Sequence, residues 1–153
     1  MTSSSGEPGP ASVEVWRRVE WSDTDAAGHH HNTAVLRWLE AAETVLHERL
    51  GIVDQTFGRT PRVRIEIDFT ERLYFGDLVE IRLAVAAVGR TSLTYSFEVA
   101  RGDMVAARGR AVVVNAGAGE GAEPWPDELR QALAGAGPQP GEYLGCGPAR
   151  PAG

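Results

Sequence analysis

The sequence contains no lysine, so its 15 basic residues are all arginine, against 21 aspartate and glutamate residues. The formal net charge of −6 gives no overall field that would attract nucleic acid or an acidic membrane surface. We therefore expect neither nucleic acid nor a membrane among the partners. Together with abundant alanine and glycine, the arginine-only set is typical of a GC-rich bacterial genome.

Cysteine is almost as scarce: the single Cys146 excludes an internal disulfide and favours a cytoplasmic location. No apolar run approaches the roughly 20 residues that a membrane-spanning helix needs. The opening segment, MTSSSGEPGPAS, has neither a basic start nor an apolar stretch, so we expect no secretory signal. A Gly-x-Ser-x-Gly motif is also missing, which argues against a serine hydrolase.

The length of 153 residues, 42% of them hydrophobic, fits a single globular domain with a real core. Composition divides the chain into three parts. Residues 1–12 are rich in Ser, Gly and Pro and are expected to be disordered, and residues 13–115 form the domain. Residues 116–153 are rich in Gly, Ala and Pro and are expected to be a loosely attached tail, with a possible short helix at residues 127–133.

One long helix is predicted after Asn32, because apolar residues recur there at helical spacing and Gly51 is a natural stop. The apolar arc consists of Val35, Leu39, Ala42, Leu46 and Leu50. The opposite, polar face consists of Arg37, Glu40, Thr44, His47 and Glu48. The wide apolar arc predicts that a sheet covers this helix.

Alternating apolar and polar residues predict five strands, at residues 13–21, 63–69, 79–87, 93–99 and 105–113. Short links should make the last four antiparallel neighbours in a meander. The sequence therefore predicts an α+β fold in which a five-stranded antiparallel sheet surrounds one long central helix.

The segment before the helix carries candidate chemistry. Asp23 and Asp25 precede Gly28, three histidines follow, and Asn32 or Thr33 is placed to cap the helix. Unpaired N–H groups and the positive end of the helix dipole at a helix start could hold a carbonyl oxygen that gains negative charge. A carboxylate nearby could attack that carbonyl, or direct water to it.

Other roles for these residues remain open at this point. Asp25 competes with an ordinary turn residue, and Asp23 is assigned to turn structure. His29 and His31 point to the same side of an extended chain, but no further ligands at zinc spacing are visible, so we expect no metal. Glu43 is the reserve catalytic carboxylate.

The segment Asp23-Thr24-Asp25-Ala26-Ala27-Gly28-His29, followed by Asn32 and Leu36-Arg37-Trp38-Leu39-Glu40-Ala41, resembles the hotdog-fold acyl-CoA thioesterases of the 4-hydroxybenzoyl-CoA thioesterase type. Weaker matches follow at Thr60-Pro61, Phe69, Tyr74-Phe75-Gly76-Asp77 and Gly89-Arg90-Thr91-Ser92. The resemblance implies that Asp25 is the catalytic carboxylate and that the N–H near Asn32 polarises the thioester carbonyl. It also implies a homodimer or homotetramer with active sites between subunits, and no cofactor.

The same resemblance implies substrate-binding roles for His29, His31, Thr60, Tyr74 and Arg90. The sequence departs from the family where it has His30 and His31 in place of aromatic or aliphatic residues, and Val35 in place of a tyrosine. Of a basic cluster that binds CoA in some relatives, only Arg90 is matched. A carrier-protein thioester is therefore as credible a substrate as acyl-CoA.

We therefore predict a hydrolase that cleaves an acyl thioester of CoA or an acyl carrier protein, with polyketide or other secondary metabolism as a possible setting. Asp25 would act as nucleophile or as general base on water. One alternative is a hotdog dehydratase, which would remove water from a hydroxyacyl thioester without releasing a thiol. The other is a non-catalytic module that binds acyl thioesters without turnover.

Overall fold

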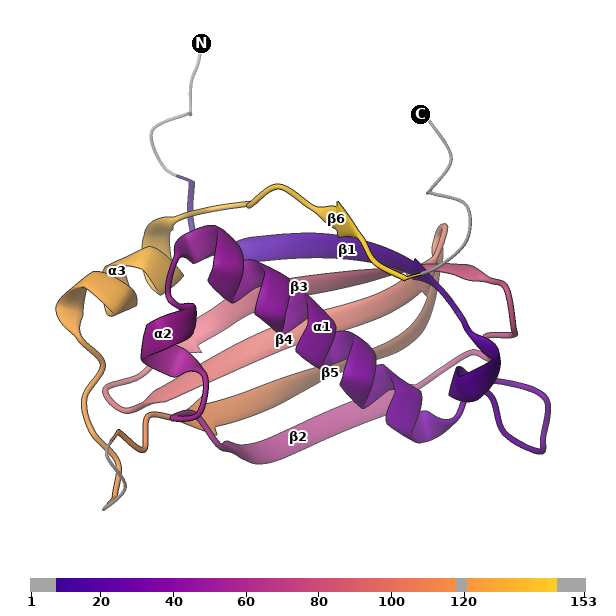
Figure 1. Cartoon of the computed structure of the whole chain (residues 1–153), viewed down its shortest axis with the longest axis horizontal. Coiled ribbons are helices and arrows are strands. Elements are labelled where there is room, and N and C mark those ends of the chain that lie inside the picture. The colour runs from indigo at the N-terminus through magenta and orange to yellow at the C-terminus, as the bar shows by residue number, and fades with distance from the viewer. Residues whose placement is uncertain (1–7, 118–120, 146–153) are drawn as a thin grey trace, which may run out of the picture.

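One long helix, α1 (Asn32–Leu50), crosses one face of a sheet in the computed structural model, which describes residues 8–117 and 121–145 (Figure 1). The strands are β1 (Ser12–Arg18), β2 (Arg62–Phe69), β3 (Leu78–Val88), β4 (Ser92–Arg101), β5 (Met104–Val114) and β6 (Glu142–Tyr143). The short helices are the 3-10 helix η2 (Trp21–Asp23), α2 (Val53–Thr56) and α3 (Asp127–Gly135). Among the described residues, no helix is both long and apolar enough to cross a membrane.

The apolar arc of α1 packs against the sheet, mainly over β1 and β3. The buried members are Ala34, Val35, Trp38, Leu39, Ala42, Val45 and Leu46. The helix stops at Gly51, whose φ of 70° lies in the left-handed region that glycine adopts most easily. One expectation for this helix is wrong: His47, which helical spacing places on the polar face, has a buried side chain.

The strand order is β2-β5-β4-β3-β1-β6. The expected four-strand meander holds only for β3, β4 and β5, because β2 pairs with β5 and β1 pairs with β3. Residues 70–77 separate β2 from β3, which is enough chain to cross the end of the sheet. The predicted α+β class with one long helix is confirmed, but the sheet has a sixth strand, and β6 runs parallel to β1.

The C-terminal segment is not the loose tail that composition suggested. Trp125, Leu129 and Leu133 are all buried, and α3 packs beside β3. The N–H of Ala11 donates to the Leu133 carbonyl at 3.0 Å, so the segment before β1 is tied to α3. Two leucines one turn apart on α3, with Trp125 just before it, dock a segment whose overall composition is that of a linker. The remaining tail residues, 118–120 and 146–153 with Cys146, lie outside the described residues.

His47 forms a buried chain of hydrogen bonds that crosses from α1 to β4. The Thr56 hydroxyl donates to the Ile52 carbonyl, so it accepts from Nδ1 of His47 at 2.7 Å. Nε2 then accepts from the hydroxyl of Tyr95 at 2.6 Å. The imidazole is therefore neutral, and burial lowers its pKa from the ordinary 6.5 to about 4.

Replacing Leu133 with alanine should lower the free energy of unfolding by about 3 kcal/mol, because it leaves a cavity beneath α3. The exposed neighbour Gln131 provides the control, since Gln131→Ala on the same helix should change stability by less than about 0.5 kcal/mol. Urea unfolding measures both. Equal, small effects for the two variants would mean that α3 is not docked in solution.

Acidification should destabilise the protein through His47. The unfolded state binds a proton below pH 6.5, whereas native His47 resists protonation until about pH 4. Above about pH 6.5 this group therefore does not lower the free energy of unfolding. As the pH drops to 4, that free energy falls by about 3 kcal/mol. Urea unfolding across this range should show the loss, and His47→Gln should reduce the slope. A His47→Gln profile as steep as the wild type would contradict this account.

Candidate functional site

A small hairpin joins η2 to α1 and carries the candidate catalytic turn. The N–H of Asp25 donates to the His29 carbonyl at 3.1 Å, and the N–H of His31 donates to the Asp23 carbonyl at 2.7 Å. Thr24 and His30 pair between them as an antiparallel bridge. The hairpin therefore holds Asp25 beside the start of α1, where sequence analysis placed the reaction.

The tip of this hairpin fixes the Asp25 carboxylate. Its Oδ1 accepts the N–H of Ala27 at 2.8 Å, and its backbone carbonyl accepts the N–H of Gly28 at 2.9 Å. Gly28 has a φ of 90°, which any other residue would adopt only with strain. In the single chain the Asp25 side chain is exposed to solvent. Its second oxygen is left for other partners.

Asp23 anchors the base of the hairpin. Its side chain is only 3% exposed, and Oδ2 accepts the N–H of Glu20 at 2.8 Å. Oδ1 pairs with Nη2 of Arg37 at 2.9 Å, which ties the hairpin to α1. The expectation that Asp23 bonds to the loop backbone is confirmed.

The start of α1 is capped by His31, and not by Asn32 or Thr33 as expected. Nδ1 of His31 accepts the N–H of Thr33 at 3.1 Å, while its carbonyl accepts the N–H of Ala34 at 2.9 Å. The imidazole of His31 thus caps the helix, a role that a shorter polar side chain usually fills. Within the described residues, the N–H of Asn32 has no acceptor, so it remains available at the positive end of the helix.

His29 and His30 differ sharply in their surroundings. His29 is half-buried, and its Nδ1 donates to the His30 carbonyl at 3.2 Å. His30 is 4% exposed and packs between the rings of Trp38 and Phe69, with centroids 6.2 and 6.1 Å away. Burial lowers the pKa of His30, and the neighbouring His29 lowers it further.

The other predicted substrate residues divide between the two ends of α1. Tyr74 follows Leu73, whose backbone bonds to His30, so it lies at the same end of α1 as the Asp25 hairpin. Thr60 donates to the Thr56 carbonyl beyond the far end of α1, and Arg90 lies in the β3–β4 turn beside Trp125. A single chain therefore does not bring Thr60 or Arg90 to Asp25.

The reserve carboxylate Glu43 is already engaged. Its Oε1 pairs with Nη2 of Arg62 at 2.8 Å, and its side chain is only 12% exposed. It lies eleven positions along α1 from Asn32, which is about 16 Å in a helix. Glu43 therefore serves as an ion-pair partner that ties β2 to α1.

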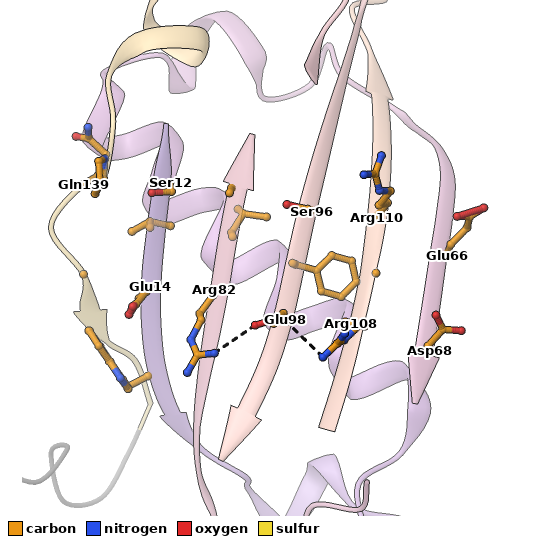
Figure 2. A pocket seen from close by; sticks show the side chains of 18 residues that line it. Ser12, Glu14, Glu66, Asp68, Arg82, Ser96, Glu98, Arg108, Arg110 and Gln139 are labelled. Atoms are coloured by element: carbon orange, nitrogen blue, oxygen red, sulfur yellow. Dashed lines mark hydrogen bonds and ion pairs between the residues drawn. The ribbon is translucent and has the colours of Figure 1, made fainter. Parts of the chain in front are cut away.

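Two of the surface hollows in the described part of the chain bear on the site. The larger, about 890 Å³, lies on the sheet face away from α1 and contains no residue of the predicted site (Figure 2). Its charges pair with one another, since Glu98 contacts both Arg82 and Arg108. The smaller, about 440 Å³, is lined by Thr70, Glu71, Arg72, Tyr74, Arg101 and Met104. It adjoins the connection that holds His30.

Sequence analysis missed two features of this site. The first is the bond between the Leu73 N–H and Nδ1 of His30, which joins residues far apart in the chain and has no local signal. The second is a set of exposed aromatic rings. Trp21, the last residue of the first predicted strand, is 77% exposed and meets Phe75 edge to face at 6.0 Å. Strand β1 ends before Trp21, so its alternation does not reach that residue.

Comparison with known proteins identifies the family. The model of the thioesterase-like superfamily matches residues 19–133. A predicted thioesterase from Bacillus stearothermophilus is 32% identical, with a TM-score of 0.72 over 80% of this chain and 93% of that one. No curated protein matches the chain by sequence.

Two further solved structures share the fold. A thioesterase from Thermus thermophilus, complexed with coenzyme A and Zn, is 27% identical, with a TM-score of 0.72 over 84% of this chain and 92% of that one. A gentisyl-coenzyme A thioesterase is 26% identical, with a TM-score of 0.69 over 78% and 98%. The chain belongs to the thioesterase-like superfamily, with the hotdog arrangement of sheet and helix.

Proposed function

We propose that this protein hydrolyses acyl thioesters, with Asp25 as the catalytic carboxylate and the N–H of Asn32 as donor to the thioester oxygen. The observation that carries the proposal is the unused N–H of Asn32 at the start of α1, next to a hairpin that holds an exposed carboxylate. A donor at a helix start stabilises the negative charge that develops on a carbonyl oxygen under attack. The products are a carboxylic acid and a free thiol.

Asp25 can act in either of two ways with the same geometry. The oxygen that accepts from Ala27 orients the carboxylate. The other oxygen would act on the substrate. As a nucleophile, it would form an anhydride that water then hydrolyses, with the thiolate leaving first. As a general base, it would take a proton from the water that attacks the carbonyl.

The substrate we favour is an acyl-CoA. The relative from Thermus thermophilus was crystallised with coenzyme A, and another is a gentisyl-coenzyme A thioesterase. Arg90 would then contact a CoA phosphate from the far end of a neighbouring subunit. An acyl carrier protein is the other source of the same thioester.

We further propose a homodimer formed along β2. The opposite edge of the sheet is covered by β6, whereas β2 pairs with β5 on one side and leaves its other side open. On the helix side of β2, Val63 is 57% and Phe69 42% exposed, and α1 packs mainly over other strands. An open edge with exposed apolar side chains is a docking surface for a second chain.

This dimer would complete the active site. A two-fold axis pairs the edge strands antiparallel, so the start of one β2 lies beside the end of the other. Thr60 of the partner subunit, just before its β2, would then approach Phe69 and the Asp25 hairpin. The separation of Thr60 from Asp25 within one chain is therefore what an interfacial site requires.

Asp25→Asn should lower kcat for acyl-CoA hydrolysis by about 100-fold or more, because an amide can neither attack nor accept a proton. Release of free thiol, followed with a thiol reagent, measures the rate. Asp54→Asn, an exposed carboxylate on α2, is the matched control and should retain wild-type kcat. Near wild-type turnover by Asp25→Asn would remove Asp25 from the chemistry.

Val63→Asp should weaken the dimer, because it places a charge in the apolar row along β2. Sedimentation equilibrium should show monomer at concentrations where the wild type is a dimer, and kcat/KM should fall at those same concentrations. Glu66→Asp, which conserves the charge on the opposite face of the same strand, is the control. A Val63→Asp protein that stays dimeric and active would place the interface elsewhere.

A further inference from the structure

His30 joins the hairpin to a distant part of the chain through two hydrogen bonds. Its N–H donates to the Leu73 carbonyl at 2.8 Å, and the N–H of Leu73 donates back to Nδ1 of the imidazole at 3.2 Å. Leu73 lies in the connection between β2 and β3. One backbone and one side-chain hydrogen bond therefore hold the returning half of the hairpin to Leu73. We call this pair of bonds the clasp.

The clasp fixes the protonation state of His30. The N–H of Leu73 can only donate, so Nδ1 must accept and the hydrogen of a neutral ring must sit on Nε2. A second proton could bind only at Nδ1, where it would face the Leu73 N–H. Protonation and the bond from the Leu73 N–H to Nδ1 therefore exclude one another.

The surroundings offer a charged imidazole little compensation. Trp38 of α1 and Phe69 of β2, whose rings lie near the imidazole, carry no charge. The backbone of Leu73 raises the pKa of His30, but burial and His29 outweigh it. The titratable groups that act on it belong to the hairpin itself: Asp25, which favours the charged ring, and His29 and His31, which oppose it. Nε2 is buried and has no partner within the described residues.

We propose that His30 is a positioning residue for thioester hydrolysis: its neutral imidazole helps to hold the Asp25 hairpin against the β2–β3 connection, and its protonation breaks the bond to the Leu73 N–H, loosens the hairpin there and lowers turnover. This inference rests on the proposed function of Asp25. The lowered pKa of His30, which follows from burial and from His29, agrees with a ring that stays neutral at physiological pH. His30 touches neither the substrate nor the reacting atoms.

Two substitutions at His30 test whether the hydrogen-bond acceptor at Nδ1 or the volume of the ring is what matters. His30→Leu fills the apolar site but offers no acceptor to Leu73, and should lower kcat by about 10- to 100-fold with little change in KM. His30→Asn places an oxygen near the position of Nδ1 and should restore kcat to within about threefold of wild type. Wild-type kcat in His30→Leu, or equal losses in both variants, would overturn the proposal.

The pH dependence of kcat distinguishes the proposed role of His30 from a merely structural one. Acidification should lower wild-type kcat more steeply than that of His30→Asn, because only the wild type carries an imidazole whose protonation breaks its bond to the Leu73 N–H. His47→Gln, which removes the other buried imidazole, should keep the wild-type slope. Circular dichroism at each pH restricts the comparison to folded protein, and equal slopes for wild type and His30→Asn would refute the switch.

An activity-independent measurement distinguishes failure of this inference from failure of the proposed function. Nitrogen-15 shifts of the wild-type protein should report His30 with its hydrogen on Nε2, and the Leu73 amide should lose exchange protection as His30 titrates. In His30→Asn the same amide should stay protected over that pH range. A hydrogen on Nδ1, or protection that ignores the titration, would overturn the role of His30 whatever the activity. Normal turnover by Asp25→Asn would instead overturn the proposed function and leave the clasp intact.

Discussion

The buried carboxylate of Asp23 is the constraint on which the candidate catalytic hairpin depends. It accepts the N–H of Glu20 with one oxygen and the guanidinium of Arg37 with the other, while its carbonyl accepts the N–H of His31. Three segments thus meet at one residue: the end of β1, the hairpin and α1. A carboxylate buried this deeply is tolerated only when its partners are in place, so the hairpin has one stable position. Asp25 lies two residues further along the same hairpin, so its position is fixed with it.

The two buried histidines differ in how many of their ring nitrogens are hydrogen-bonded. His47 lies in a complete chain of bonds from Tyr95 to Thr56, so its neutral form is fully paired in the core. His30 has only its Nδ1 engaged, and its Nε2 is left without a partner in the described structure. An unpaired buried donor costs about 1–3 kcal/mol, which an aliphatic residue at that position would avoid. What His30 supplies in return is an acceptor for the backbone of Leu73.

Local patterns predicted the elements well, and long-range pairing poorly. Helical and alternating spacing located α1 and β1 to β5, because burial of one face dictates both periods. The position of β2 beside β5, and the docking of α3, depend on contacts between distant segments that no period records. The candidate site divides in the same way. Asp25 and Asn32 are neighbours in sequence and share one hairpin and helix start, whereas the burial of His47 and the Leu73 clasp required the fold.

The two edges of the sheet differ, and this difference supports the proposal that a second chain completes the site. The tail adds β6 to the β1 edge, which removes that edge from pairing, and the other edge is left open along β2. The apolar row on the helix side of β2 is uncovered at both ends, at Val63 and Phe69, and Phe69 also touches His30. A chain docked there would cover the ring that packs on the clasp and exclude water from the hairpin. Lower water content strengthens the interaction of a carboxylate and a helix-start N–H with a developing charge. Assembly and catalysis would then depend on the same strand.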